Sequence, residues 1–447
     1  MTQPRIEPVA DLTARRLRVL LARDQVAGRL PSVVGGVVRD GELVWSSSYG
    51  DTAGPGVQYR IGSITKTLVA VVVMQLRDEG LLDLNDRLDQ HLPGVDYGDR
   101  TIRSLLSHSS GMHSEPAGEW WERTPGGSFD ELSSRLADVP PAFPAGTTFH
   151  YTNIAFGLLG ELVARLTATT WFEAVRTRLL LPLDMNRTSY LPEQPAAQGY
   201  SVHHFANTLD EEPAHDAGAM APAGQVWSTV EDLGRYAAFL ASGNTEVLAE
   251  ATLDEMCTPQ SGSLAGAMAG GYGLGFRLAA GGSGMVFGHT GSMPGFLAGL
   301  FADRARRTGA VVLANGTSGL RAEALPLELL HTLEELEPTL PVAWQPATQV
   351  PDEVRDLLGV WHWGNTAYGF SWTGTHVVAC HLGNGVEAHR FVFRDGQLVG
   401  SAGYHHGETL WLRRHEDGSV SHLEGATFIY TRTPYDDTAP IPGGPPA

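Results

Sequence analysis

The chain has 447 residues, of which 42% are hydrophobic and 18% charged, a composition typical of a soluble globular protein with room for two domains. Its formal net charge of −19 would repel nucleic acids and anionic membranes, so we expect no partner of either kind. The two cysteines, Cys257 and Cys380, lack the spacing of a disulfide framework or a cysteine metal site, which favours a reducing compartment.

The N-terminal residues carry charges around only a short apolar patch, which is unlike a signal-peptide core. No later stretch approaches the roughly 18 apolar residues that span a membrane. The sequence therefore predicts a cytoplasmic protein. Its first elements are a predicted amphipathic helix at residues 12–29 and a predicted β-hairpin at residues 31–50, with the turn at Asp40-Gly41.

A helix is predicted to begin at Ser63 and to continue through an apolar run from Thr67 to Leu76. Ser63 and Lys66 lie three positions apart, so their side chains share one face of the helix start, where free backbone N–H groups can stabilise an oxyanion. A Ser-x-x-Lys match alone favours a helix cap followed by a solvated lysine.

Lysine usage decides between these two interpretations. Of the 31 cationic residues, 30 are arginine, and Lys66 is the single lysine. A guanidinium cannot act as a base near neutral pH, whereas a desolvated ammonium can lose its proton. The apolar run that follows has no polar face, so we expect Lys66 to be buried with its helix. We therefore predict that Ser63 is a nucleophile and that Lys66 activates it.

Two features of the next segment have open interpretations. His108 lies in the polar turn that follows a short predicted helix within residues 102–112. It could be catalytic, but the backbone partners that such a turn offers favour a structural role. Residues 119–127, with Trp120 and Trp121, could wall a pocket or form a packed surface loop.

Tyr151 and Asn153 lie two positions apart in a predicted extended stretch that precedes a helix, so their side chains should point the same way. A tyrosine at such a place is usually a packing residue. Beside a Ser/Lys pair, however, a phenol can move a proton and an amide can bind the acyl oxygen or the substrate backbone.

The histidines that follow do not predict a metal site. His203, His204 and His215, with Asp216, lack the i, i+4 regularity of helical metal sites. We therefore expect neither a metal nor any other cofactor.

A helix and several glycine-rich strands complete the first domain. Ser228 or Thr229 caps a predicted helix that ends near Gly243. In the triplet His289-Thr290-Gly291, flanking glycines let a substrate backbone approach a strand closely. The predicted strands and the final helix lie at residues 271–278, 284–288, 297–302, 310–314 and 320–336.

Four prolines mark residues 337–356 as a linker, so residues 1–336 are the predicted catalytic domain. Residues 357–433 alternate short β-rich runs with turn signals such as Asn384-Gly385 and Asp395-Gly396. This pattern predicts a meander of about eight strands that closes into a small barrel or half-barrel. Residues 434–447 are a predicted loose tail.

Three motifs occur in a characteristic order: Ser63-x-x-Lys66, Tyr151-x-Asn153 and His289-Thr290-Gly291. With them, the chain up to the linker resembles the penicillin-binding-protein and class C β-lactamase superfamily of serine hydrolases. The resemblance implies an α/β sandwich with a central antiparallel sheet and a helical subdomain.

The resemblance also implies roles for individual residues. Ser63 would form an acyl-enzyme, and Lys66 and Tyr151 would move its proton. The backbone N–H groups of Ser63 and Ser292 would form the oxyanion hole. Asn153 would bind the substrate amide, beside the substrate-binding strand that carries His289, Thr290 and Gly291.

One departure from the family pattern is informative. Many members have Lys-Thr-Gly where this chain has His289-Thr290-Gly291, and a largely neutral imidazole anchors a carboxylate less well than an ammonium. This difference argues against a true β-lactamase. It resembles instead the esterase, aminopeptidase and peptide-cyclase branches.

The end of the chain resembles a lipocalin-like domain, through Gly359-Val360-Trp361 and the segment 431–436. Such domains are appended to penicillin-binding-protein-type thioesterases, which release and cyclise nonribosomal peptides, and also to other hydrolases. Within this domain Arg432 is a candidate substrate contact, because an arginine can hold an anionic or carbonyl group with two hydrogen bonds.

The preferred interpretation is a cytoplasmic acyltransferase that takes a peptidyl thioester with a C-terminal D-residue, free or on a carrier protein, and releases a head-to-tail macrolactam. A DD-carboxypeptidase, D-aminopeptidase or esterase is the hydrolytic alternative. A non-catalytic penicillin-binding module is a third possibility, against which the retained lysine argues.

Overall fold

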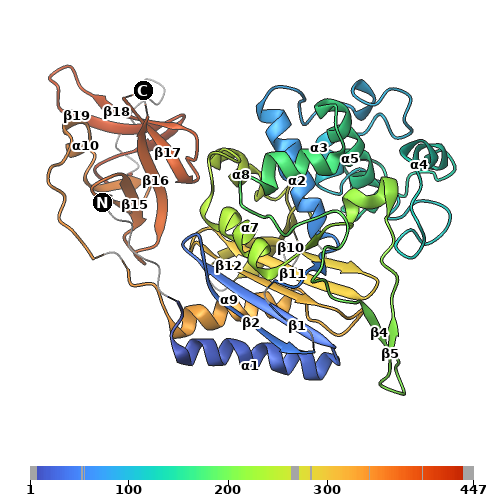
Figure 1. Cartoon of the computed structure of the whole chain (residues 1–447). Coiled ribbons are helices and arrows are strands. Elements are labelled where there is room, and N and C mark those ends of the chain that lie inside the picture. The colour runs from blue at the N-terminus through green and yellow to red at the C-terminus, as the bar shows by residue number, and fades with distance from the viewer. Residues whose placement is uncertain are drawn as a thin grey trace. The chain divides into compact units, whose positions relative to one another are not determined.

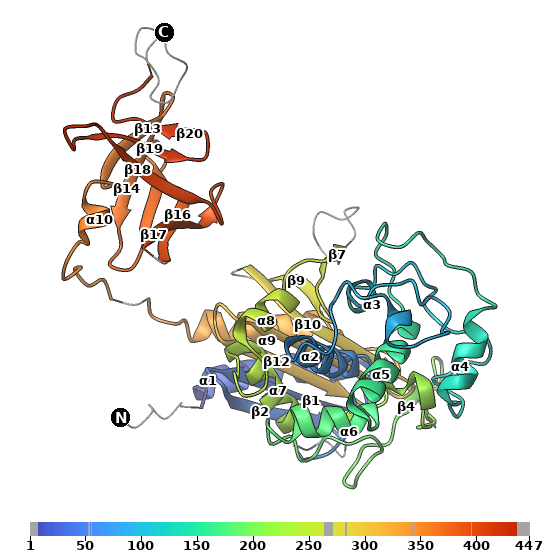
Figure 2. The same cartoon turned by 90° about the horizontal axis from the view of Figure 1, so that it is seen from above.

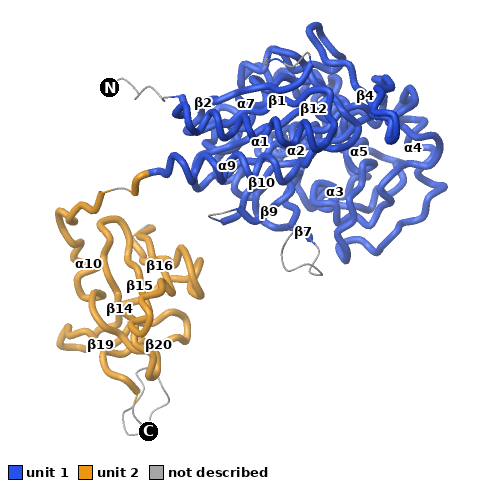
Figure 3. Tube along the Cα trace, turned by 90° about the horizontal axis from the view of Figure 1, so that it is seen from below, with its two compact units in different colours: residues 1–339 blue, residues 340–447 orange. Residues whose placement is uncertain are grey.

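The computed structural model describes residues 8–435, except residues 52–53, 55, 263–270, 282–283, 342 and 395. The chain divides into two compact units, residues 1–339 and 340–447, which Figure 3 colours separately. The turn residue Asp395 and residues 436–447 of the predicted tail lie outside the described residues. In the described part of the chain, no helix is long and apolar enough to cross a membrane.

The first unit is built on an eight-stranded sheet in the order β2-β1-β12-β11-β10-β9-β8-β7, in which every neighbouring pair is antiparallel. Figure 1 shows helices on both of its faces. The strands are β1 (Ser32–Arg39), β2 (Glu42–Gly50), β7 (Ser261–Gly262), β8 (Gly271–Tyr272), β9 (Arg277–Gly281), β10 (Gly284–Met293), β11 (Phe296–Asp303) and β12 (Thr308–Ala314).

Helices and short strand pairs surround this sheet. The α-helices are α1 (Asp11–Gly28), α2 (Ile64–Asp78), α3 (Ile102–Leu106), α4 (Phe129–Leu136), α5 (Asn153–Thr167), α6 (Trp171–Val175), α7 (Val230–Ser242), α8 (Glu250–Met256) and α9 (Ala324–Leu336). Shorter elements are η1 (Leu88–Gln90), η2 (Arg176–Leu180), η3 (Gly218–Ala223), β3 (Tyr59–Arg60), β6 (Trp227–Ser228), β4 (Tyr200–Val202) and β5 (Leu209–Glu211). The view from above in Figure 2 shows the helices that lie, with α2, on one face of the sheet.

Strand β12 shows how the sheet separates two cores. Ala310 and Val312 pack with apolar residues of α1 and α9, whereas Val311 and Leu313 join the larger cluster on the opposite face, which contains α2, α5 and α7. Successive residues of a strand face opposite sides, so an unbroken apolar run indicates a sheet that is covered on both faces.

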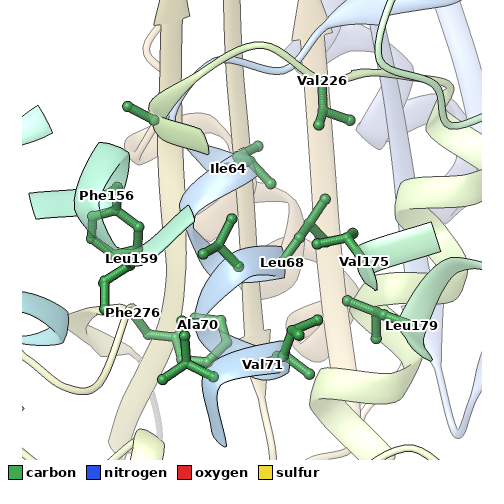
Figure 4. Packing of buried hydrophobic residues seen from close by; sticks show 14 of the residues in the cluster. Ile64, Leu68, Ala70, Val71, Phe156, Leu159, Val175, Leu179, Val226 and Phe276 are labelled. Carbon is green, nitrogen blue, oxygen red and sulfur yellow. The ribbon is translucent and has the colours of Figure 1, made fainter. Parts of the chain in front are cut away.

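Helix α2 lies inside the larger core, and every residue from Ile64 to Leu76 is buried or nearly so. Figure 4 shows its apolar side chains packed against those of neighbouring elements. Phe156 and Leu159 come from α5, Val175 from α6 and Phe276 from the turn before β9. A helix without a polar face is stable only when other elements enclose it, so the apolar run led to the correct expectation of burial.

The segment predicted as one strand at residues 271–278 is instead divided between β8 and β9. Gly273 N–H donates to the Phe276 carbonyl at 2.8 Å, which makes a turn between the two strands. Gly275 in this turn has a φ of +87°, and a Cβ on it would stand 2.2 Å from the Cβ of Ala70 in α2. The break therefore lets the chain pass close to the buried helix.

The second unit is a nearly closed antiparallel barrel of eight strands in sequential order from β13 to β20. His362 in β13 and Thr431 after β20 exchange two backbone hydrogen bonds, 2.7 and 2.9 Å long, which join its first and last strands. Its elements are α10 (Asp352–Arg355), β13 (Gly359–Trp363), β14 (Thr366–Trp372), β15 (Val377–His381), β16 (Glu387–Arg394), β17 (Gln397–Gly403), β18 (Thr409–Arg414), β19 (Val420–Gly425) and β20 (Phe428–Tyr430). The predicted α/β fold followed by a small β-barrel is confirmed.

Candidate active site

The start of α2 lies directly against strand β10. Gly62 has a φ of +53°, and a Cβ on it would stand 2.4 Å from the backbone nitrogen of Ser292. A Cβ on Gly291 would stand 1.9 Å from the Ile61 carbonyl oxygen. Two glycines thus allow the backbone just before Ser63 to lie against the backbone of β10 at Gly291 and Ser292.

Ser63 and Lys66 are joined by a direct hydrogen bond. Lys66 Nζ donates to Ser63 Oγ at 2.8 Å and to the Ala223 carbonyl oxygen at 2.7 Å. Ser63 is half-buried, whereas Lys66 is 0% exposed. The Ala223 carbonyl belongs to η3, which packs on α5, so a third element fixes the direction of the amine.

Burial lowers the pKa of Lys66 to about 7, and the nearby carboxylates Glu115 and Glu122 oppose this effect. No carboxylate of the described residues forms an ion pair with the ammonium, and its only acceptors are the neutral atoms named above. A large fraction of the amine is therefore unprotonated at neutral pH, and in that form it can accept the Ser63 proton.

Tyr151 lies beside this pair. Lys66 Nζ is 5.0 Å from the centroid of its ring, and its hydroxyl is buried without a hydrogen-bond partner among the described residues. Burial raises the pKa of Tyr151 well above its usual value, while the neighbouring Ser63 side chain opposes the rise. A neutral phenol without a partner can pass a proton between the serine and a leaving group.

Asn153 is the first residue of α5 rather than part of an extended stretch, because Thr152 caps the helix through its hydroxyl. Its side-chain Nδ2 donates to Glu115 Oε1 at 2.6 Å. Trp121 Nε1 donates to the other oxygen, Glu115 Oε2, at 2.7 Å. The amide is therefore held in one orientation beside the site, and its oxygen makes no hydrogen bond within the described part of the chain.

His289 is buried on β10, and the protein satisfies both of its ring nitrogens. Nδ1 lies 2.5 Å from the Thr290 carbonyl oxygen, so Nδ1 carries the proton, and Nε2 accepts from the Tyr272 hydroxyl at 2.9 Å. Burial, together with the nearby Lys66, lowers the pKa of His289 to about 3. The ring is neutral and has no N–H left for a substrate carboxylate, so we revise its predicted role from ligand contact to wall of the site.

The remaining residues of the triplet, with Ser292, alternate in exposure along β10. Thr290 is half-buried and Ser292 is exposed, whereas Gly291 is buried against Ile61. The side chains alternate between the two faces of the sheet, as in any pleated strand. On one side β10 is paired with β11. The strand edge beside Ser63 therefore presents backbone groups, which suits an extended peptide.

Arg432 lies in the second unit, and its contacts within that unit are structural. Its guanidinium stacks 3.7 Å from the centroid of the Trp361 ring. Its N–H groups donate to the carbonyl oxygens of Asp356, Leu358 and Val360 at 2.6 to 3.1 Å. These contacts tie the end of the barrel to its beginning, and the role of Arg432 in substrate binding stays a prediction.

Other histidines have roles within the protein. His108 Nδ1 accepts from the Thr152 backbone N–H at 3.1 Å, as the structural interpretation of this residue expects. His203 Nδ1 accepts from the backbone of its own turn. Among the described residues, no group of three or more His, Cys, Asp and Glu side chains could hold a metal ion.

Together these groups can carry out acyl transfer. We propose Ser63 as the nucleophile, Lys66 as the proton acceptor and Tyr151 as a proton carrier, with the backbone N–H groups of Ser63 and Ser292 as the proposed oxyanion hole. Sequence reasoning missed Glu115, Glu122 and Tyr272, because a solitary Glu or Tyr carries no local spacing signal. The Trp120-Trp121-Glu122 run was the available hint, and both of its tryptophans donate to carboxylates, Trp121 to Glu115 and Trp120 to Glu122.

Comparisons with known proteins agree with this geometry. Residues 16–333 match the family described as Beta-lactamase, and residues 350–432 match a domain of unknown function, DUF7586. Penicillin-binding protein 4 of Amycolatopsis lactamdurans is 33% identical over 245 residues, which are 49% of this chain and 62% of that protein. The chain spans between half and about three fifths of the length of the first two curated relatives that it matches.

Solved structures show the same fold. A D-stereospecific amidohydrolase from Streptomyces sp. has a TM-score of 0.62 and 27% identity, and the match covers 73% of this chain and 99% of that one. SurE has a TM-score of 0.60 and 23% identity, and the match covers 94% of this chain and 99% of that one. SurE has also been solved with D-Leu.

Proposed function

Because this chain belongs to the β-lactamase family of serine hydrolases, we propose that Ser63 takes the acyl group of a peptidyl thioester and that the peptide leaves as a head-to-tail macrolactam. The proposed donor ends in a D-residue and can be delivered on a carrier protein in the cytoplasm. The observation that carries this proposal is the single lysine of the chain, fully buried 2.8 Å from the Ser63 hydroxyl.

The preference for a D-residue rests on the relatives. The D-stereospecific amidohydrolase is 27% identical to this chain, and SurE binds D-Leu in one of its structures. The proposal that the peptide leaves by cyclisation rests on the effective concentration of its own amine. A peptide's own amine, held near the ester, has an effective concentration orders of magnitude above that of bulk water, which is about 55 M.

Hydrolytic release is the second candidate, and the same amidohydrolase supports it. The two candidates share the acylation step and differ only in whether water or an amine reaches the ester. A β-lactamase is less well supported, because the neutral His289 offers no ammonium to the β-lactam carboxylate. Slow or absent hydrolysis of nitrocefin is the expected result, and rapid turnover would contradict this reading of His289.

The deciding experiment compares two short peptidyl thioesters that differ only in the configuration of the last residue. We expect macrolactam from the D-terminated epimer and slow acylation by the L-terminated one, measured in one chromatogram with mass detection. A Ser63→Ala protein is the negative control. Linear acid as the exclusive product from both epimers, or release of D-Ala from a D-Ala-D-Ala peptide, would assign the hydrolytic function instead.

A further inference from the structure

The ring of His108 packs against the ring of Tyr151. The two ring centroids are 4.2 Å apart, and His108 is 0% exposed. Lys66 Nζ lies 5.0 Å from the centroid of the same tyrosine ring. Tyr151 therefore has two immediate neighbours, the proposed base and a fully buried histidine.

The same histidine also fixes the backbone on both sides of Tyr151. The His150 N–H donates to the His108 carbonyl oxygen at 2.8 Å. The Thr152 N–H donates to His108 Nδ1 at 3.1 Å. Because these two residues come directly before and after Tyr151, His108 holds the chain from residue 150 to residue 152 with its backbone, its ring nitrogen and its ring face.

The backbone of His108 has a conformation that histidine rarely adopts. Its φ is +55°, in the left-handed region, where glycine and asparagine are the favoured residues. Neither of those residues has an aromatic ring. A histidine at a strained position indicates a use for its ring, and the contact with Tyr151 is such a use.

Two further rings complete a buried cluster around this pair. The Tyr272 ring centroid lies 4.6 Å from that of His108 and 5.9 Å from that of His289. The Tyr151 and His289 centroids are also 5.9 Å apart, and the Tyr272 hydroxyl donates to His289 Nε2 at 2.9 Å. Each of the four rings thus neighbours two others. They come from the turn after α3, the segment before α5, β8 and β10, so the cluster joins distant parts of the chain at Tyr151.

His108 is not itself a proton carrier. Its Nδ1 is an acceptor, so the proton of the neutral ring is on Nε2, which is buried without a hydrogen-bond partner among the described residues. Burial, together with the nearby Lys66, lowers the pKa of His108 well below its usual value. A ring that stays neutral and has no partner at its N–H does not exchange protons with a substrate. Any effect of His108 on the reaction therefore passes through Tyr151.

We propose that His108 is a positioning residue that holds the Tyr151 phenol where it protonates the leaving group; the inference rests on the proposed function. In acylation, Ser63 Oγ forms a bond to the acyl carbon and gives its proton to Lys66. The bond from the acyl carbon to the leaving group breaks, Tyr151 gives its proton to that group, and Lys66 returns a proton to Tyr151. A displaced phenol slows only the transfer to the leaving group.

The test measures how acylation depends on the leaving group. The substrates are aryl esters of one D-terminated peptide, from p-nitrophenyl to p-methoxyphenyl. The p-nitrophenolate leaves without a proton, whereas the more basic p-methoxyphenolate depends more strongly on protonation. Release of the phenol gives kcat/KM for the wild-type protein, His108→Ala and His108→Asn. Tyr151→Phe shows the pattern that loss of the phenol itself produces.

The variants are chosen so that folding and positioning can be separated. Asparagine keeps a side-chain acceptor for the Thr152 N–H and tolerates a positive φ, but it lacks the ring. Circular dichroism and thermal unfolding check the fold, and the asparagine variant decides if His108→Ala does not fold. His150→Asn is the matched control, because the side chain of this adjacent histidine contacts Ser114 and Phe143.

We expect kcat/KM of His108→Ala to fall about tenfold more for the p-methoxyphenyl ester than for the p-nitrophenyl ester, as in Tyr151→Phe, and of His108→Asn about threefold more. His150→Asn should show small, equal losses along the series. Equal losses in folded His108 variants would overturn the positioning role alone. Equal losses in Tyr151→Phe would overturn the proton-carrier role and this inference with it. A wild-type protein that forms no acyl-enzyme on Ser63 from any ester, by mass spectrometry, would overturn the proposed function as well.

Discussion

Burial of Lys66 lowers the stability of the folded protein and also gives this residue its proposed function as a base. An ammonium that is 0% exposed loses its hydration, and its two hydrogen-bond acceptors are a neutral hydroxyl and a carbonyl. Neither compensates a full charge as a carboxylate would, so the neutral amine is favoured and its pKa falls to about 7. The same desolvation that destabilises the folded protein therefore supplies the base.

This account predicts that Lys66→Arg abolishes turnover, because the charge is kept while the basicity is lost. It also predicts the pH profile of the wild-type protein. Acylation needs the neutral amine, so kcat/KM for an activated ester should rise with pH, reach half its maximum near the pKa of about 7 and then level off. The measurement is a rate profile from about pH 5 to about pH 9.

Arg77→Lys, a change of cation in the same helix, is the matched control and should retain activity. An active Lys66→Arg protein would remove the mechanistic basis of the proposal. A profile that is flat through neutral pH would assign the proton transfer to another group.

At the scale of elements, the site depends on how closely α2 and β10 approach. The contact is made by backbone at Gly62 and Gly291, not by side chains. The Ser-x-x-Lys motif lies at the helix end that carries the free N–H groups, and the neighbouring strand contributes one more. The proposed oxyanion hole therefore depends on two elements and on the glycines that let them approach.

Gly62→Ala is expected to reduce the rate at which a fluorophosphonate labels Ser63 by about a hundredfold, since small displacements of reacting groups cost that much. The new Cβ would stand 2.4 Å from Ser292 N and would separate the helix from the strand. Gly80→Ala is the control: its φ of +74° imposes similar backbone strain, but its Cβ would meet nothing within 4 Å. Equal labelling rates in the two variants would show that close approach is not required.

The elements differ in how well the sequence predicted them. The helix after Ser63 and the eight strands of the barrel were predicted, because apolar periodicity and turn residues act over a few positions. The hydrogen bond from Asn153 to Glu115 joins residues 38 apart, and that from Arg123 to Glu212 joins residues 89 apart. Such contacts depend on tertiary packing, which no local spacing encodes. The hydrogen bond between Tyr272 and His289 was not predicted for the same reason.

At the scale of the whole molecule, the chain consists of two units with separate cores. The barrel buries its own cluster around Trp361, Phe370 and Tyr430, and the first unit encloses the proposed catalytic residues. A unit with its own core and its own hydrogen-bonded sheet can fold alone. Arg432 stacks on Trp361 within the barrel.

A chain that ends after Thr339 is therefore expected to fold and to form the fluorophosphonate adduct on Ser63 at a rate close to that of the full chain. Thermal unfolding and mass spectrometry measure the two properties. If the barrel helps to exclude water, the shortened chain should give more linear acid and less macrolactam from the same thioester. Identical products from both chains would show that the barrel has no part in release.

With Lys66 as its single lysine, the chain has no side-chain amine on its surface. Arginine stays protonated and does not attack acyl groups, whereas exposed lysines are slowly modified by activated esters and thioesters. A protein that works among thioesters would gain from this composition, because stray acyl transfer to its own surface is largely avoided. Amine-directed labelling of side chains therefore has one target, Lys66, and because this amine is fully buried, its labelling would report directly on opening of the acyl site.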